Sequence, residues 1–321
     1  AIDAYLAKLI RAGKKAAICD QMEEPSQAKG IVRREVTRVV TPGTVTEDEI
    51  LDAARNNYLA ALYAGKALGL ALLDLSTGAF TVEAVSDAAA LAELLKRYAP
   101  SECLIGREAL ADPRVQCVRA AGALGTVTDI DDWTFEYDCA CDRLLRHFQV
   151  HSLEGYGCEG VAELVGPAGA LLRYVNEELR HAVSHVRALH VRHADAFLTL
   201  DENTCVNLDL IPQRGKPQET TLLGVLNNTQ TPMGARLLRT WMIRPLRQAP
   251  AIKARLDAVE CLTCQRLVLN DLREKLAQIR DLERLIARID SGRGNARDVR
   301  ALAASLLPVP ALRERLEQTT D

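Results

Sequence analysis

The sequence predicts an α/β domain followed by an all-helical domain, with the last part of a small α/β unit before them. Strand-like apolar runs alternate with helical stripes in the first part of the chain, a pattern typical of α/β domains. From residue 140 onward, apolar residues recur at intervals of three and four, which indicates helices. A length of 321 residues is also large for a single core. We therefore expect an N-terminal unit (1–40), a linker (41–55), an α/β domain (56–185) and a helical domain (186–321).

Composition restricts the class of protein. The net charge is −3, whereas a dedicated nucleic-acid-binding module usually carries a basic excess. This balance still allows a local basic site. The mean hydropathy is −0.05 and no apolar run is long enough to span a membrane. The chain begins with Ala1 and shows no targeting leader, so we expect it to be a piece of a longer protein.

The first 55 residues are predicted to contain two helices and two strands. An apolar stripe predicts an N-terminal helix that Gly13 ends, with inward residues Ile2, Tyr5, Leu6, Leu9 and Ile10. Residues 16–19 predict a buried strand, and residues 36–40 a second strand that leaves through a turn at 41–44. Acidic residues open the segment 47–55, which predicts a short linking helix.

The α/β domain begins with three predicted strands at 57–62, 68–75 and 79–85. Gly65-Lys66 and Ser76-Thr77-Gly78 are suitable hairpin turns between them. A helix over 88–98 should follow, with Leu91, Leu94 and Leu95 facing inward. Further strands are expected over 103–105 and 116–119.

The region after residue 140 is predicted to be helical. Two apolar stripes stand out, formed by Leu144, Leu145 and Phe148, and by Leu164, Leu171, Leu172, Val175 and Leu179. Pro167 is expected near the start of the second helix, where proline is tolerated. Later helices are predicted over 250–262, with Ile252, Leu256 and Val259 inward, and over 267–289. Gly292 and Gly294 interrupt the pattern, and Asn295 or Asp298 should cap a further helix that ends at Pro308.

The most specific pattern lies between Leu198 and Leu246. Residues 222–226 predict a short helix that the following asparagines interrupt. Thr231 is a good N-cap, Pro232 suits the first helical position, and Arg244 before Pro245 should end this second helix. Its predicted buried stripe consists of Leu237, Leu238 and Trp241.

This stretch resembles the start of the lever (core) domain of the MutS family, the bacterial DNA mismatch-repair recognition proteins. The resemblance rests on Asp201, Asn207, Thr229, Thr231, Pro232, Met233, Gly234, Arg236, Trp241 and Pro245. It continues downstream through Asp281-Leu282-Glu283-Arg284, Arg288 and Arg297-Asp298. Near the N-terminus, Ala17-Ile18-Cys19, Gln21 and Lys29-Gly30 resemble the end of the family's mismatch-binding domain.

The resemblance implies a role for each part. It makes residues 56–185 the connector domain, whose sheet is similar to the ribonuclease-H-like fold and which is linked to recruitment of a MutL-type repair partner. The aromatic wedge of the family lies earlier in the mismatch-binding domain and is missing here, whereas the basic residues Lys29, Arg33 and Arg34 are predicted to contact DNA phosphates. For the full-length family it implies mismatched double-stranded DNA as ligand, ATP and magnesium as cofactors, a homodimer and a cytoplasmic location.

No phosphate-binding loop of the Gly-x-x-x-x-Gly-Lys-Ser/Thr type occurs in the sequence. Without such a cradle of backbone N–H groups, we expect this chain to have no catalytic residues and neither to bind nor to hydrolyse ATP. The resemblance implies that the nucleotide site lies C-terminal to these residues. The chain is therefore interpreted as connector and lever segments that couple mismatched-DNA binding to an ATPase domain elsewhere.

An independent metal-dependent nuclease is the alternative function. Its two-metal site would use acidic residues of the α/β domain, namely Asp74, Glu102, Asp129, Asp131 and Asp132. Asp74, however, precedes a turn in which Asp is common, and the cluster from Asp129 to Asp132 resembles a cap before the Trp133 segment. Analogy of fold does not establish a site, so mismatch repair is the favoured interpretation.

The cysteines and histidines predict no metal site. Nine irregularly spaced cysteines indicate reduced, mostly buried thiols. Two pairs, Cys261/Cys264 and Cys139/Cys141, lack the further ligands that zinc requires, and the first pair is predicted to pack in the core. The histidine pairs His147/His151 and His181/His185 lack the Glu that follows the first His in metalloprotease helices, so packing or surface roles are expected.

Overall fold

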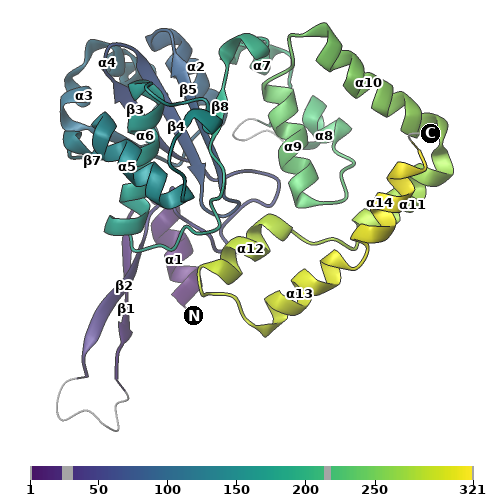
Figure 1. Cartoon of the computed structure of the whole chain (residues 1–321), viewed down its shortest axis with the longest axis horizontal. Coiled ribbons are helices and arrows are strands. Elements are labelled where there is room, and N and C mark those ends of the chain that lie inside the picture. The colour runs from purple at the N-terminus through teal and green to yellow at the C-terminus, as the bar shows by residue number, and fades with distance from the viewer. Residues whose placement is uncertain (1, 24–31, 213–217, 320–321) are drawn as a thin grey trace. The chain divides into compact units, whose positions relative to one another are not determined.

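The structure is a computed structural model that describes residues 2–23, 32–212 and 218–319 (Figure 1). The chain forms two compact units. Unit 1 comprises residues 1–51 and 57–192, and unit 2 comprises residues 52–56 and 193–321. The chain therefore leaves unit 1 after Leu51, contributes five residues to unit 2 and re-enters unit 1 at Asn57. No helix in the described ranges is long and apolar enough to cross a bilayer.

The N-terminal part of unit 1 consists of α1 (Ile2–Arg11) and an antiparallel ribbon of β1 (Ala16–Gln21) and β2 (Arg34–Val40). Helix α1 buries Leu6 and Ile10 in a small cluster, whereas the predicted inward residues Tyr5 and Leu9 are 69% and 46% exposed. The strand at 16–19 is confirmed, but its predicted burial is wrong. A two-stranded ribbon has no further strand on either side, and none of the β1 residues is fully buried.

The predicted helix over 47–55 is wrong, because these residues form successive turns. The backbone N–H of Ile50 donates to the Glu47 carbonyl at 3.0 Å, and that of Arg55 donates to the Asp52 carbonyl at 3.3 Å. The Asp52 side chain accepts from the Ala54 N–H at 2.9 Å. Aspartate used in this way competes with helical hydrogen bonding and favours a turn.

A six-stranded sheet of order β7-β6-β3-β4-β5-β8 forms the centre of unit 1. Strands β3, β4 and β5 are antiparallel neighbours, whereas β6, β7 and β8 each pair in parallel. The strands expected over 57–62, 68–75, 79–85 and 103–105 are confirmed. The bounds are β3 (Leu59–Ala64), β4 (Leu68–Asp74), β5 (Ala79–Val85), β6 (Glu102–Gly106), β7 (Thr126–Ile130) and β8 (His190–Arg192).

The predicted strand over 116–119 is wrong, because these residues belong to α4 (Pro113–Ala120). Asp112 caps this helix by accepting from the Arg114 N–H, and Pro113 occupies its first position. The cap outweighs the strand propensity of the residues that follow. Strand β7, which the sequence did not predict, takes the sheet edge instead.

Helices cover the sheet of unit 1 as α2 (Ala88–Tyr98), α3 (Arg107–Ala111), α4, α5 (Tyr137–Phe148) and α6 (Ala162–Arg173). The inward leucines predicted for α2 are all buried. Helix α6 lies against β3 and β4, and its apolar stripe is buried as predicted. It continues into a π-helical turn, Tyr174–Glu178.

A close approach of α6 to β4 depends on two unusual residues. Pro167 lies inside α6 rather than at its start, and it has no N–H to bond the Glu163 carbonyl one turn earlier. That carbonyl faces Gly69 of β4, where a Cβ atom would lie only 1.8 Å from the Glu163 oxygen. The contact between helix and sheet therefore requires glycine at position 69.

Unit 2 is helical in its described residues. Its helices are α7 (Glu202–Asn207), α8 (Leu222–Leu226), α9 (Pro232–Ile243), α10 (Ala249–Cys264), α11 (Arg266–Leu276), α12 (Leu282–Asp290), α13 (Ala296–Leu306) and α14 (Val309–Glu317). The helix predicted over 267–289 is divided, because the chain turns at 277–281 and Asp281 caps α12. Asn295 and Asp298 together form a capping box at α13, as the sequence indicated.

The apolar stripes predicted for α9 and α10 are not the buried faces. Leu237 and Trp241 are 52% and 40% exposed, while α9 buries Ala235, Arg236 and Ile243. On α10, the predicted inward residues Ile252, Leu256 and Val259 are all exposed. Helical spacing shows that an apolar face exists, but not which face has a partner. On α9 the buried side is the one that carries Arg236 and its ion pairs.

Candidate functional site

Arg236 on α9 is a fully charged residue that is only 4% exposed. Its Nη1 and Nη2 atoms donate to the two carboxylate oxygens of Asp281 at 2.7 and 2.8 Å, and Nη2 also donates to Glu283 at 2.6 Å. Nη1 further donates to the backbone carbonyl of Ala53 at 3.0 Å. Burial alone would lower the pKa of Arg236, but the hydrogen bonds to both carboxylates outweigh it and raise that pKa.

Arg284 on α12 is a second buried cation, 5% exposed. Its Nη2 atom donates to the carbonyl oxygens of Asp52 and Arg55, both at 2.9 Å. Arg236 and Arg284 therefore bind three carbonyl groups of the segment 52–55. We refer to Arg236, Asp281, Glu283 and Arg284 as the arginine clamp.

Asp281 orients the arginine clamp. Its carboxylate caps α12 by accepting from the Arg284 N–H at 3.3 Å while it binds the guanidinium of Arg236 at two points. Burial would raise the pKa of Asp281, but the hydrogen bonds and charge of Arg236 lower it more strongly. The carboxylate is thus ionised at neutral pH, and the two-point geometry is one that lysine cannot reproduce. The arrangement is suited to holding backbone in place rather than to chemical reaction.

Helix caps explain several of the signature residues. Asp201 accepts from the Thr204 N–H at 2.6 Å, and Thr231 accepts from the Gly234 N–H at 3.1 Å. Gly234 also packs against Thr229, since a Cβ atom at position 234 would lie 3.3 Å from the Thr229 Cβ. These residues determine where α7 and α9 begin.

The remaining signature residues have packing or hydrogen-bonding roles. The Arg255 guanidinium lies 3.8 Å from the centre of the Trp241 ring, a cation–π distance. Met233 packs against the cluster of Leu272, Ile279 and Leu312. The Pro245 carbonyl accepts from the Leu198 N–H at 2.8 Å. Pro232 and Asn207 are the first residue of α9 and the last residue of α7.

The predicted DNA-contacting residues lie on or beside the ribbon of β1 and β2. Lys29 falls outside the described residues. Arg33 is exposed and forms an ion pair with Glu35, and Arg34 is exposed at the start of β2. Arg38 forms an ion pair with Glu47 at 2.7 Å. Arg33 and Arg34 are therefore the exposed members of the predicted set that the structure describes.

The acidic residues of the nuclease alternative bind groups of the protein itself. Asp74 accepts from the backbone N–H of Asn57 and from both the N–H and the hydroxyl of Ser76. Glu102 accepts from the hydroxyls of Thr128 and Tyr174 at 2.6 and 2.9 Å. Among the residues that the structure describes, no group of three or more His, Cys, Asp or Glu side chains is arranged to hold a metal ion. Nothing in this geometry supports a nuclease.

Three histidines have packing roles, as predicted. The Nε2 atoms of His147, His181 and His185 contact backbone carbonyls at 2.7, 3.0 and 2.8 Å. The cysteines are free, but the prediction of mostly buried thiols is wrong. Four of the nine are exposed, and these include Cys264, for which core packing was predicted.

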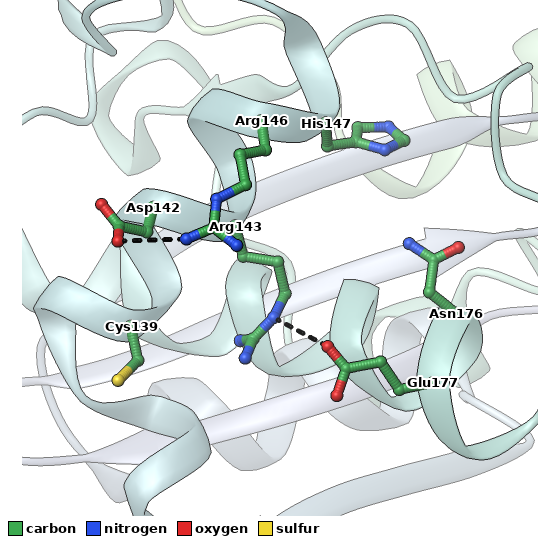
Figure 2. Close-up of a pocket in the computed structure, with 7 residues that line it drawn as sticks. All are labelled: Cys139, Asp142, Arg143, Arg146, His147, Asn176 and Glu177. Atoms are coloured by element: carbon green, nitrogen blue, oxygen red, sulfur yellow. Dashed lines mark hydrogen bonds and ion pairs between the residues drawn. The ribbon is translucent and has the colours of Figure 1, made fainter.

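A polar pocket of about 450 Å³ lies between α5 and the π-helical turn that follows α6 (Figure 2). Its lining consists of Cys139, Asp142, Arg143, Arg146 and His147 from α5, and Asn176 and Glu177 from the turn. Sequence reasoning considered only Cys139 and His147 in this set, as possible metal ligands. The spacing of Arg143 and Arg146 places both on one helix face and was a signal that could have indicated the pocket.

Comparison with known proteins identifies the family. Residues 1–49 match the family model for MutS domain I, residues 57–187 that for MutS domain II, and residues 203–321 that for MutS domain III. The DNA mismatch repair protein MutS of Desulfosudis oleivorans is 41% identical over 99% of this chain and 36% of its own length. Those of Cytophaga hutchinsonii and Methanococcoides burtonii are 38% and 39% identical, over 99% and 98% of this chain and 36% of their own lengths. The chain thus spans about a third of the length of these relatives. It belongs to the MutS family of DNA mismatch repair proteins and contains regions that match domains I, II and III.

Proposed function

We propose that this chain is the connector and lever portion of a mismatch-recognition protein, and that it couples the binding of mismatched DNA to an ATPase domain outside these residues. In this proposal unit 1 carries the end of the mismatch-binding domain and the connector, and unit 2 carries the first part of the lever. Coupling of this kind requires packed elements whose arrangement changes as a whole.

The observation that carries the proposal is the position of the segment held by the arginine clamp. Residues 50–56 lie between the regions that match MutS domains I and II, whereas Arg236, Asp281 and Arg284 lie in the region that matches domain III. The third region therefore fixes the backbone that joins the first two. A movement of the helices that carry Arg236 and Arg284 would therefore act directly on this linking segment.

The strand order supports the proposed likeness of the connector to the ribonuclease-H-like fold. Three antiparallel neighbours, β3 to β5, are extended on the β3 side by the parallel strands β6 and β7. Asp74 and Glu102 bind internal donors, so we propose a structural role for this sheet.

The partners follow from the same proposal. Arg33 and Arg34, with Lys29, would contact phosphates of mismatched double-stranded DNA. Such contacts position a protein on DNA without reading the base sequence. The full-length protein would act as a cytoplasmic homodimer with ATP and magnesium, and the connector would recruit a MutL-type repair partner. No residue of this chain is assigned to the nucleotide.

The test uses a MutS-family protein of full length that contains this segment. Arg236→Lys with Arg284→Lys retains both charges but removes the forked contacts to the linker carbonyls. We expect mismatched-duplex binding to persist, while stimulation of ATP hydrolysis by mismatched over matched duplex falls ~10-fold, about 1.4 kcal/mol of coupling. Arg300→Lys, an exposed position on α13, is the matched control. Unchanged stimulation in the double variant would contradict the proposal.

A further inference from the structure

The pocket beside α5 continues into a second one of about 700 Å³, and the two share Arg146, His147 and Asn176. Together they form one elongated cleft, which we refer to as the α5 cleft. The second half adds an apolar wall of Phe148, Ala182, Val183 and Val186, with Arg187 at its edge. All of these residues belong to unit 1.

The α5 cleft as a whole is lined by three arginines, Arg143, Arg146 and Arg187, against two acidic residues, Asp142 and Glu177. The Arg143 side chain is 17% exposed, donates to the Gly169 carbonyl at 3.2 Å and lies 3.8 Å from Glu177. Burial lowers the pKa of Arg143, and the neighbouring Arg173 and Arg146 lower it further, against the opposing effect of Glu177. Another anion at the Arg143 end of the cleft would relieve that repulsion.

Several donors at the same end are available to a ligand. The Arg146 side chain is 82% exposed and has only a long contact of 3.4 Å with Asp142, which is itself exposed. Asn176 is exposed on the π-helical turn, where it faces the cleft across from α5 (Figure 2). Such π-helical turns occur frequently at functional sites. A carboxylate between Arg143, Arg146 and Asn176 would gain charge-assisted hydrogen bonds.

The apolar half determines what else the ligand must offer. Val183 and Val186 are buried beneath the cleft, and the Val186 carbonyl fixes the His147 ring through Nε2 at 2.7 Å. This wall is preformed and suits an apolar side chain a few residues away from the carboxylate. A site with one charged and one apolar end can bind an extended peptide segment through a carboxylate and an apolar side chain.

Nucleic acid is a poorer match for the same surface. Residues 137–187 contain five arginines and no lysine, against seven acidic residues. A polyanion would meet Asp142 and Glu177 directly, whereas a single carboxylate can be placed between the arginines. The local balance therefore favours a short acidic segment over a phosphate backbone.

We propose that the α5 cleft is a binding site for an extended acidic peptide segment of a partner protein. One carboxylate of the segment lies between Arg143, Arg146 and Asn176, and a neighbouring apolar side chain lies against Phe148 and Ala182. This proposal does not depend on the role assigned to the arginine clamp.

The test is a fluorescence-anisotropy titration of the whole chain with a labelled, end-capped peptide that carries one aspartate and, a few residues away, one leucine. Arg146→Gln removes a charge-assisted bond to the carboxylate worth about 1.5 kcal/mol or more, and Arg187→Gln removes a second positive charge from the edge of the cleft, so the double variant should weaken binding at least ~10-fold. Arg119→Gln on α4, also exposed and in unit 1, is the matched control and should bind as the unaltered chain does. The same peptide with asparagine in place of aspartate should bind at least ~10-fold more weakly.

Glu177→Gln should strengthen peptide binding, whereas the arginine variants weaken it, and a purely structural role of these residues would not produce such a gain. Glu177→Gln removes a carboxylate that competes for Arg143, so binding of the aspartate peptide should become ~3–10-fold tighter. Equal affinity of all variants, or equal binding of the asparagine peptide, would overturn the proposal. Tighter binding of a DNA duplex that is lost in the double variant would also overturn it and would assign the cleft to nucleic acid.

Discussion

Replacing Arg236 by methionine tests the arginine clamp most directly, because methionine keeps much of the side-chain volume and removes the charge. The Asp281 carboxylate, whose side chain is 16% exposed, would then lose both of its short bonds to Arg236, and the Ala53 carbonyl would lose its donor. Breaking a buried ion pair on one side typically costs about 3–5 kcal/mol. Glu283 is 46% exposed, so its bond adds little to that loss. We expect the free energy of unfolding of unit 2 to fall by about 3–5 kcal/mol.

The two tryptophans allow each unit to be followed separately, since Trp133 lies in unit 1 and Trp241 in unit 2. Urea denaturation in a Trp133→Phe background therefore reports on unit 2 through Trp241. Arg300→Met, at an exposed position on α13, is the control and should change the free energy by less than about 0.5 kcal/mol. Hydrogen exchange of the Ala54 and Arg55 amides, which are bonded within the linker, should accelerate in Arg236→Met only.

A loss below about 1 kcal/mol, with linker exchange unchanged, would refute this reasoning. It would mean that Asp281 finds water or another donor once Arg236 is removed. The ion pair would then contribute little to the conformation of residues 52–55.

Three further predictions concern separate parts of the chain. Gly69→Ala should destabilise unit 1 by about 3 kcal/mol or more, because a Cβ atom would lie 1.8 Å from the Glu163 carbonyl oxygen. The measurement is a urea melt followed by Trp133 fluorescence, and Gly155→Ala, where the added Cβ would have no atom within 4 Å, is the control. The pKa of Asp281 is lower in the folded state, so its stabilising effect is present above the unfolded value of ~3.9 and is lost as the pH falls through the folded value. Urea melts from neutral to acid pH should therefore show that the loss of unfolding free energy in Asp281→Asn becomes smaller at low pH. A loss that stays constant with pH would contradict the stabilising role of the ionised Asp281 carboxylate. Arg34→Ala should weaken binding of this chain to matched and mismatched duplexes alike and reduce the salt dependence of log K by about 1, whereas a loss confined to the mismatched duplex would show that Arg34 does more than contact phosphate.

Local chemistry accounts for the elements that could be predicted from the sequence. Thr231 with Pro232, and Asn295 with Asp298, determine helix starts through hydrogen bonds to residues within one turn, so these starts were predicted correctly. The turns at 65–66 and 76–78 similarly defined three neighbouring strands. The signature residues of the MutS family were visible in the same way. By contrast, the helix expected over 47–55 failed because the Asp52 side chain supports a turn.

Long-range contacts decided the rest. The apolar periodicity of α9 and α10 cannot show which face meets a partner, so Leu237, Trp241 and Leu256 were wrongly expected to be buried. Arg236 was recognised only as a family residue, because the Asp281 and Ala53 atoms that it binds lie 45 and 183 positions away in the sequence. The amino-acid sequence by itself thus determined the family, several helix caps and most strands, since these depend on neighbours along the chain. Only the tertiary structure decided that a buried arginine on α9 holds the backbone of residue 53, because that contact requires segments distant in sequence to meet where water is excluded.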